Sequence, residues 1–277
     1  MLNQAVRLSF SKLFNFESFR EKAIFHLRQY YFRELDFSVR LGQGFDCPIS
    51  DVSASYSFTE IFFENEYKPV FDLIDLPSRW LDLGCHYGYF SLYVAWLRAK
   101  QNLPQNFCGL LVDADSRVLS GVSTLIQRNH LEAQLSFRHG AISSGSGSVY
   151  FHESDVMSSS LSGLLPNNTL ANTSSVPIID QQIIESLLPP PYDLVKIDVE
   201  GGEYDFFLSY ERILQNTSHM VLEWHSWHRG GGSLSQILDL AKSYGFELLQ
   251  EIQPTKLCGD PATPGEVGVL LFKRSAA

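Results

Sequence analysis

The chain has 277 residues, a length that fits one large α/β domain with an N-terminal extension. Apolar residues make up 44% and charged residues 19%, a composition that argues against a disordered chain. The 21 basic and 31 acidic residues give a net charge of −10 without any long basic run. Non-specific nucleic-acid binding is therefore disfavoured, because it depends on neutralising phosphates.

The N-terminal segment at residues 11–35 is aromatic and helix-like. Its basic and acidic residues alternate instead of forming a cationic face, so a packed cap helix is favoured over attachment to a membrane surface. No stretch approaches the roughly 20 apolar residues of a membrane span, and no signal-peptide core is visible. We expect residues 1–59 to form an N-terminal extension or cap, and residues 60–277 to form one domain.

The four cysteines lie far apart in the chain and show no CxxC spacing. They do not resemble a disulfide framework, so we expect the protein in the reducing cytoplasm.

Apolar strands and amphipathic helices alternate from residue 78 onward, as in a parallel sheet with helices on both faces. Strands are predicted at 79–84, 107–113, 134–139, 192–199, 218–225, 246–252 and 267–273. Helices are predicted at 88–100, 116–129, 180–188, 203–215 and 233–244, with Asp180 and Ser233 as N-caps.

The loop between the last two predicted strands is rich in Pro and Gly and has no room for a crossover helix. These two strands are therefore expected to be antiparallel. The predicted fold is α/β and Rossmann-like: a doubly wound, mostly parallel seven-stranded sheet with one antiparallel strand near the C-terminus, plus an N-terminal helical extension.

Two segments, 143–149 and 154–175, are rich in Ser, Asn or Gly and are predicted to be loops. The second is long enough to be a lid over a site, and it is equally compatible with a flexible surface insertion.

The segment WLDLGCHYGYF at 80–90 predicts a buried strand that turns sharply into a helix. Gly84 and Gly88 suit such a turn because glycine tolerates positive φ and leaves space for close approach to the backbone. Their GxxxG spacing differs from the GxGxxG that holds a pyrophosphate. This difference favours a cofactor without a pyrophosphate.

Acidic residues recur where the predicted strands end. In an open α/β sheet, ligands bind at the carboxyl ends of the strands, where the topology reverses. Asp113 suits a ribose diol because a carboxylate accepts hydrogen bonds from both hydroxyls, whereas Asp115 is favoured as a helix cap. Lys196 lies two residues before Asp198 on the same side of its strand, so we expect it to pair with an acid.

These segments make the chain similar to the FkbM-like methyltransferases, a group of class I S-adenosylmethionine-dependent enzymes, over about residues 60–225. The most diagnostic stretch is KIDVEG at 196–201. The other matching residues are Glu64-Asn65-Glu66-Tyr67, LDLGxxxGYFSL at 81–92, Leu125, Asn129, Gly140-Ala141-Ile142, LVKIDVEGGE at 194–203 and LEWH at 222–225.

The resemblance implies a set of cofactor-binding residues for S-adenosylmethionine. In this set Asp82, Gly84 and Gly88 line the methionine part, Asp113 binds the ribose, and Ala141 lies at the adenine edge. His86 and Asp198 complete the predicted set, and Asp198 and Glu200 lie where the methyl group meets the acceptor. This chain departs from its relatives in two places: they usually have Ala-Asn at Cys85-His86, and Glu-Pro at Asp113-Ala114.

Methyl transfer to a hydroxyl requires alignment and a group that takes the proton. We predict His225 as this base, with Asp198, Glu200 and Glu203 as competitors, while a purely structural histidine stays equally open. Trp224 or Trp227 is a candidate to stack on the acceptor, and an ordinary turn with one core tryptophan is the alternative. Although Asp198, Glu200, Glu223 and His225 offer oxygen and nitrogen atoms, no tight ligand motif joins them, and we expect no metal.

We therefore predict an S-adenosylmethionine-dependent methyltransferase that methylates a hydroxyl oxygen on a small molecule, natural product or sugar. Its expected partner is a small-molecule or glycan acceptor, with no nucleic acid and no membrane span. Two alternatives stay open: an NAD-dependent oxidoreductase, which the missing GxGxxG opposes, and a catalytically silent binding protein of the same fold.

Overall fold

The computed structural model describes residues 37–152, 160–161, 173–227, 232–258 and 265–275. The predicted cap helix at 11–35 and most of the predicted lid at 154–175 lie outside these ranges. The described residues form two compact units. The first comprises 37–76, 87–105 and 118–133, and the second comprises 77–86, 106–117 and the described residues from 134 onward.

The first unit is built around a β-hairpin and a buried helix. The side chain of Asn129 fixes the hairpin, since it accepts a hydrogen bond from the N–H of Asp46 at 2.8 Å and donates one to its carbonyl at 2.7 Å. Trp96 donates from Nε1 to the carbonyl of Leu41 at 3.0 Å. The elements are β1 (Phe37–Gly42), β2 (Phe45–Ile49), α3 (Val52–Phe58), the π-helical η2 (Thr59–Phe63), α4 (Lys68–Leu73), α5 (Tyr89–Lys100) and α6 (Leu119–Arg128).

Helix α3 continues directly into η2, so no break in secondary structure marks the predicted boundary between residues 59 and 60. The division into 1–59 and 60–277 stays a prediction. In the part of the chain that the structure describes, no helix is both long and apolar enough to cross a membrane.

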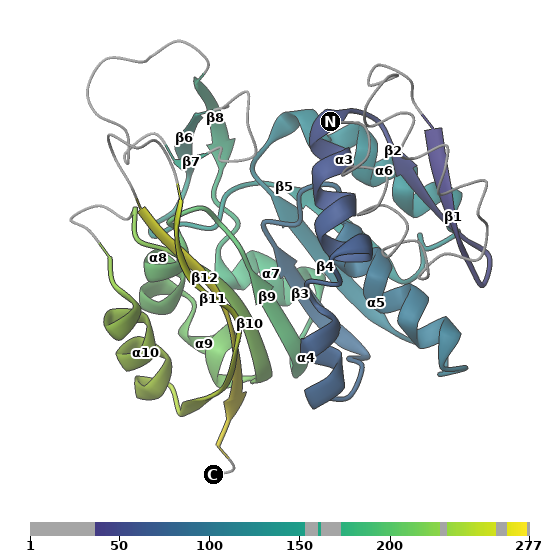
Figure 1. Ribbon diagram of the computed structural model, residues 1–277. Helices are drawn as coiled ribbons and strands as arrows, with labels where there is room; N and C mark the ends of the chain where they lie inside the picture. Colours follow the sequence, from purple (N-terminus) through teal and green to yellow (C-terminus); the bar gives the residue numbers. More distant parts are fainter. Residues whose placement is uncertain (1–36, 153–159, 162–172, 228–231, 259–264, 276–277) are drawn as a thin grey trace, which may run out of the picture. The chain divides into compact units, whose positions relative to one another are not determined.

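The second unit contains the seven-stranded sheet, in the order β11-β12-β10-β9-β3-β4-β5. The pairs β10–β9, β9–β3, β3–β4 and β4–β5 are parallel, whereas β12 runs antiparallel to both β10 and β11. The Rossmann-like sheet with one reversed strand is confirmed (Figure 1). Its strands are β3 (Arg79–Leu83), β4 (Cys108–Asp113), β5 (Leu135–His139), β9 (Tyr192–Ile197), β10 (Thr217–His225), β11 (Phe246–Cys258) and β12 (Gly265–Arg274).

Helices α8 and α10 pack on the β10 and β11 side of this sheet (Figure 1). The helix predicted at 203–215 is divided at Tyr210, whose buried hydroxyl donates to the carbonyl of Ile179 at 2.9 Å. The predicted caps are confirmed, because Asp180 and Ser233 accept hydrogen bonds from the first turns of α7 and α10. The 3₁₀ turn η3 (Ser116–Val118) precedes α6, and the helices are α7 (Gln181–Leu187), α8 (Glu203–Ser209), α9 (Glu211–Gln215) and α10 (Leu234–Ser243).

A small antiparallel sheet, β7-β6-β8, was not predicted. Its strands are β6 (Ser148–His152), β7 (Ser160–Leu161) and β8 (Thr173–Pro177), in segments predicted to be loops or adjoining them. Phe151 and Val176 are buried while Tyr150 is exposed, which is the alternation of a half-buried sheet. The serine-rich flanks concealed this alternation, and the pairing of β6 with β8 joins segments far apart in the sequence.

Candidate active site

The carboxyl ends of β3, β4 and β9 lie side by side because the three strands are parallel neighbours in the sheet, and backbone hydrogen bonds continue just beyond the strand ends. The N–H groups of Gly84 and Cys85 donate to the carbonyl of Val112 at 2.9 and 3.0 Å. The N–H of Asp198 donates to the carbonyl of Leu83 at 2.9 Å. The acids predicted at these strand ends are therefore brought to one edge of the sheet.

The loop after β3 contains three residues in the left-handed region, Gly84, His86 and Gly88, the last with φ +79°. Gly84 has φ +73°, and a Cβ at this position would lie 1.6 Å from the carbonyl oxygen of Asp198. The space that glycine leaves is thus filled by the chain after β9 rather than by a ligand. His86 has φ +48°, a conformation in which Asn and His are enriched. Backbone conformation therefore accounts for the exchange of Asn for His at this position.

Asp113, at the end of β4, holds this loop in place. Its Oδ2 accepts from the N–H of His86 at 2.6 Å, and its Oδ1 accepts from the N–H of Asp115 at 2.8 Å. Burial raises the pKa of Asp113 to about 6. Because each carboxylate oxygen can accept more than one hydrogen bond, the carboxylate keeps capacity for ribose hydroxyls.

Asp115 serves as a cap, as predicted. Its Oδ1 accepts from the N–H of Arg117 at 2.9 Å, and its Oδ2 lies 2.6 Å from the Arg117 guanidinium. Burial alone would raise the pKa of Asp115, but the hydrogen bonds and charge of Arg117 lower it.

Ala141 follows β5 and is buried. Its N–H donates to the carbonyl of Pro177 at 2.8 Å, and its own carbonyl accepts from the N–H of Ile179 at 3.0 Å. Because its N–H is already used, a contact between Ala141 and adenine is restricted to its methyl group and its carbonyl oxygen.

Lys196 of β9 is buried beneath the loop after β3. Its Nζ donates to the carbonyl of Gly84 at 2.6 Å and lies 3.4 Å from Asp198 Oδ2 and 3.6 Å from Asp82 Oδ1. Burial alone would lower the pKa of Lys196, but the carboxylates of Asp198 and Asp82 raise it well above its usual value. The predicted pairing of Lys196 with an acid is confirmed.

His225, at the end of β10, lies among three carboxylates, two from the segment that follows β9 and one from β10 itself. Its Nδ1 is 2.9 Å from Glu203 Oε1, and its Nε2 is 3.7 Å from Glu200 Oε2 and 3.9 Å from Glu223 Oε1. Its ring packs against Trp227, with the ring centroids 4.5 Å apart. Trp224 is fully buried in the hydrophobic core, so the prediction that it could stack on an acceptor is wrong. Burial alone would lower the pKa of His225, but Glu203 and Glu200 raise it to about 10.

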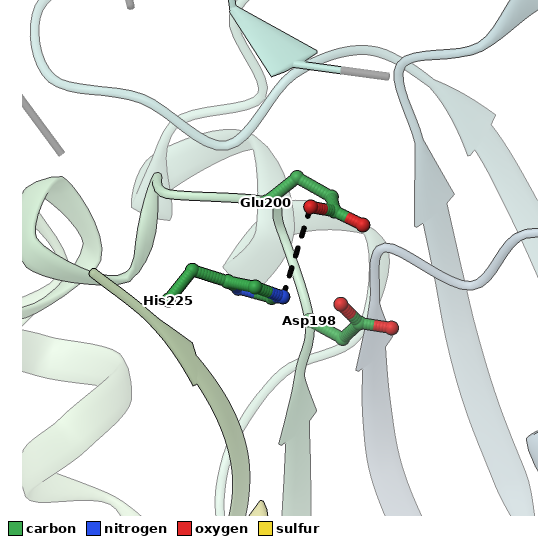
Figure 2. Close-up of side chains that lie close together, drawn as sticks. All are labelled: Asp198, Glu200 and His225. Atoms are coloured by element: carbon green, nitrogen blue, oxygen red, sulfur yellow. Dashed lines mark ion pairs between the residues drawn. The ribbon is translucent and has the colours of Figure 1, made fainter. Parts of the chain in front are cut away.

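Glu200 has φ +51°, which is uncommon for a non-glycine residue. Its Oε2 is buried without a hydrogen-bond partner among the described residues, although it forms the ion pair with His225. Burial raises the pKa of Glu200 to about 8, despite the opposing charge of His225. Figure 2 shows the imidazole pointing toward the Glu200 carboxylate, with the Asp198 carboxylate nearby.

Glu203 binds His225 and the backbone that precedes α8. The sequence alone makes Glu203 only a competitor for the role of base. Its side chain is fully buried at the start of α8, and its carboxylate accepts from the N–H groups of Gly201 and Val199 as well as contacting His225. The available signal was its place in KIDVEGGE, which made it only a competitor for the base.

Among the described residues, Asp198, Glu200 and His225 form the group that could surround a cation. One possible ligand atom from each of these residues lies within 4.8 Å of the other two. In this structure His225 and Glu200 form an ion pair with each other. Lys196 already pairs with Asp198. The expectation of no metal stays a prediction.

The chemistry of these strand ends fits S-adenosylmethionine. The buried carboxylate of Asp113 suits a ribose, and the acids Asp82, Asp198 and Glu200 favour a cationic sulfonium. A pyrophosphate at the same edge would be repelled by these carboxylates. The sheet order and the acid-bearing strand ends define a class I methyltransferase.

The family model described as "Methyltransferase FkbM domain" matches residues 96–248, more than half of the chain. The chain belongs to the FkbM methyltransferase family, and its cofactor is S-adenosylmethionine. No curated protein matches the chain.

Several solved structures are similar in fold. TehB from Haemophilus influenzae is 12% identical with a TM-score of 0.48, covering 83% of this chain and 68% of that one. An O-methyltransferase from Bacillus cereus in complex with SAH is 10% identical with a TM-score of 0.41, covering 76% and 80%. The complex of aTrm5 with tRNALeu is 11% identical with a TM-score of 0.48, covering 87% and 53%. None of these similarities identifies an acceptor for this chain, and the absence of nucleic-acid binding stays a prediction.

Proposed function

We propose that this methyltransferase transfers its methyl group to a hydroxyl oxygen of a small molecule, natural product or sugar. The observation that carries this proposal is the pairing of Glu200 with His225 beside Asp198. A hydroxyl acceptor must lose a proton, and this pair supplies a partly buried group that can take it.

The residues that bind the cofactor are proposed from the family motif and from the contacts at the strand ends of the second unit. Asp82, Gly84, His86 and Asp198 surround the methionine part, and Asp113 binds the ribose. Gly88, which precedes α5, and Ala141 complete the set as predicted from the sequence. When bound, S-adenosylmethionine supplies an electrophilic methyl group, and these residues orient it toward the acceptor.

The proposed catalytic residues are His225, Asp198 and Glu200, and one of them must accept the proton. Because the surrounding carboxylates keep His225 protonated, the base in our proposal is Glu200. It acts in its ionised form, and its pKa of about 8 makes it a stronger base than an ordinary carboxylate. The acceptor oxygen bonds to the methyl carbon as the carbon–sulfur bond breaks, and the hydroxyl proton passes to Glu200. His225 and Asp198 orient the acceptor.

The wider organisation of the chain is also proposed. Residues 60–277 form the methyltransferase domain and residues 1–59 form an N-terminal extension or cap. The cysteine spacing favours the cytoplasm as the location. The acceptor is a small molecule or glycan, because the acids at the strand ends oppose a polyanion.

The experiment combines binding with transfer. Isothermal titration is expected to show binding of S-adenosylhomocysteine and no binding of NAD. Labelled S-adenosylmethionine is then supplied with sugars, polyketides and phenols, and with amines for comparison.

Transfer to hydroxyl compounds supports the proposal, whereas transfer confined to amines overturns the O-methylation. Binding of NAD in place of S-adenosylhomocysteine would establish the oxidoreductase. Cofactor binding without transfer to any acceptor would favour the silent binding protein.

A further inference from the structure

A single buried cation, Lys196, contacts three of the residues assigned to the cofactor. Its Nζ donates to the carbonyl of Gly84 at 2.6 Å, and the carboxylates of Asp198 and Asp82 lie 3.4 and 3.6 Å away. Its side chain is only 5% exposed, and that of Asp82 is fully buried. The Asp198 side chain is 27% exposed, so the network is buried at Lys196 and Asp82 and reaches solvent at Asp198.

The contacts of Lys196 reach two loops that pass very close to each other. A Cβ on Gly84 would lie 1.6 Å from the carbonyl oxygen of Asp198, so the loops after β3 and β9 are in backbone contact there. The ammonium group of Lys196 donates a hydrogen bond to the carbonyl of Gly84 in the first loop. It also pairs with the carboxylate of Asp198 in the second loop. Loss of the ammonium group would remove the side-chain hydrogen bond to Gly84 and leave the backbone bond from the N–H of Asp198 to the carbonyl of Leu83.

The charges of this network do not cancel. Asp82 and Asp198 contribute two negative charges as carboxylates, and Lys196 contributes one positive charge. S-adenosylmethionine carries a sulfonium charge that S-adenosylhomocysteine lacks. Replacing Lys196 with a neutral side chain would therefore strengthen the attraction for the substrate form of the cofactor more than for the product form.

We propose that Lys196 is a positioning residue of the cofactor site, which fixes the Gly84 loop and cancels one of two carboxylate charges so that the sulfonium is not bound too tightly. The inference rests on the proposed placement of Asp82, Gly84 and Asp198 at the cofactor. Methyl transfer removes the positive charge from sulfur. Excess negative charge would stabilise the ground state more than the transition state and slow the reaction.

The test is the nearly isosteric substitution Lys196→Met, with dissociation constants for S-adenosylmethionine and S-adenosylhomocysteine measured by isothermal titration at low salt. We expect S-adenosylhomocysteine to bind about tenfold more weakly, because the loop loses its anchor. We expect the affinity ratio of S-adenosylmethionine to S-adenosylhomocysteine to rise at least about threefold, because a compensating charge is lost. A purely structural role would weaken both ligands equally.

Three further variants complete the experiment. Lys196→Arg keeps the charge but not the geometry, so S-adenosylhomocysteine should bind more weakly while the affinity ratio stays at the wild-type value. A second neutral substitution, Lys196→Gln, should raise the affinity ratio as Lys196→Met does, and it tests the proposal if Lys196→Met does not fold. Lys242→Met removes an exposed lysine of α10 and should change neither affinity.

The outcomes separate this inference from the proposed function. If the wild-type protein binds neither ligand, the proposed cofactor site is contradicted, whatever the role of Lys196. If it binds both and Lys196→Met leaves both affinities unchanged, or lowers both with an unchanged ratio, the role of Lys196 is overturned. A changed ratio in Lys196→Arg overturns it as well.

Discussion

At the scale of single residues, the proton on His225 is controlled by groups that its sequence position does not reveal. The sequence placed His225 at a strand end beside Glu223. The structure adds Glu203 at 2.9 Å and Glu200 at 3.7 Å, from the segment that follows β9. These carboxylates keep the imidazole protonated, which is why the proton-accepting role moves from His225 to Glu200 in our proposal.

Glu203→Gln should lower the pKa of His225 by at least about one unit, because a buried carboxylate is replaced by a neutral group of the same shape. The pKa is measured by NMR titration of the imidazole resonances in the full-length protein. Glu251→Gln, an exposed substitution on β11, serves as the control and should leave the titration unchanged. An unaltered pKa in Glu203→Gln would contradict the proposed pairing.

The raised pKa of His225 also predicts how stability depends on pH. The folded protein keeps this proton up to about pH 10, whereas the unfolded chain releases it near its usual pKa of about 6.5. The stabilising contribution is thus fully present below about pH 6.5 and is lost as the pH rises toward 10. Urea unfolding across this range should show a smaller decrease for Glu203→Gln than for the wild-type protein.

At the scale of elements, the starts of helices were easier to predict than breaks within them. Asp180 and Ser233 act as N-caps through hydrogen bonds within one turn, so nearby sequence was sufficient. The break at Tyr210 depends on a hydrogen bond to Ile179, which is 31 residues away. The β6–β8 pairing was likewise missed because its strands meet only across a long intervening segment.

Gly84→Ala should destabilise the second unit by about 3 kcal/mol or more. The residue has φ +73°, and the new Cβ would collide with backbone atoms that cannot move easily. Urea denaturation measures the change in the free energy of unfolding.

Gly245→Ala provides a matched control, because Gly245 has φ +78° but no atom lies within 4 Å of its built Cβ. This substitution carries the conformational strain alone and should cost only about 1 kcal/mol. Equal losses in the two variants would show that the close approach of Asp198 is not what requires glycine.

At the scale of the whole molecule, the net charge of −10 is partly concentrated at the active edge of the sheet. Asp82, Asp198, Glu200, Glu203 and Glu223 come from three segments of the chain, and Lys196 and His225 are the cations that pair with them. The sheet order brings these groups together. The remaining negative charge favours a cationic ligand, which S-adenosylmethionine provides.

We predict that no metal is required at this edge. Chelator treatment should leave the affinity for S-adenosylhomocysteine unchanged, and titration with Mn²⁺ should give no saturable binding heat. The physical reason is that His225 and Glu200 already neutralise each other. Saturable Mn²⁺ binding that disappears in Asp198→Asn would contradict this prediction.

The sequence by itself determined the seven strands of the main sheet and the helices between them, the reversed strand near the C-terminus, the caps and the family. Each of these depends on local periodicity, short loops or a contiguous motif such as KIDVEGGE. Only the tertiary structure decided which carboxylates surround Lys196 and His225, why Gly84 has no room for a side chain, and that β6 pairs with β8. These features depend on contacts between segments far apart in the chain, whose geometry a linear pattern does not contain.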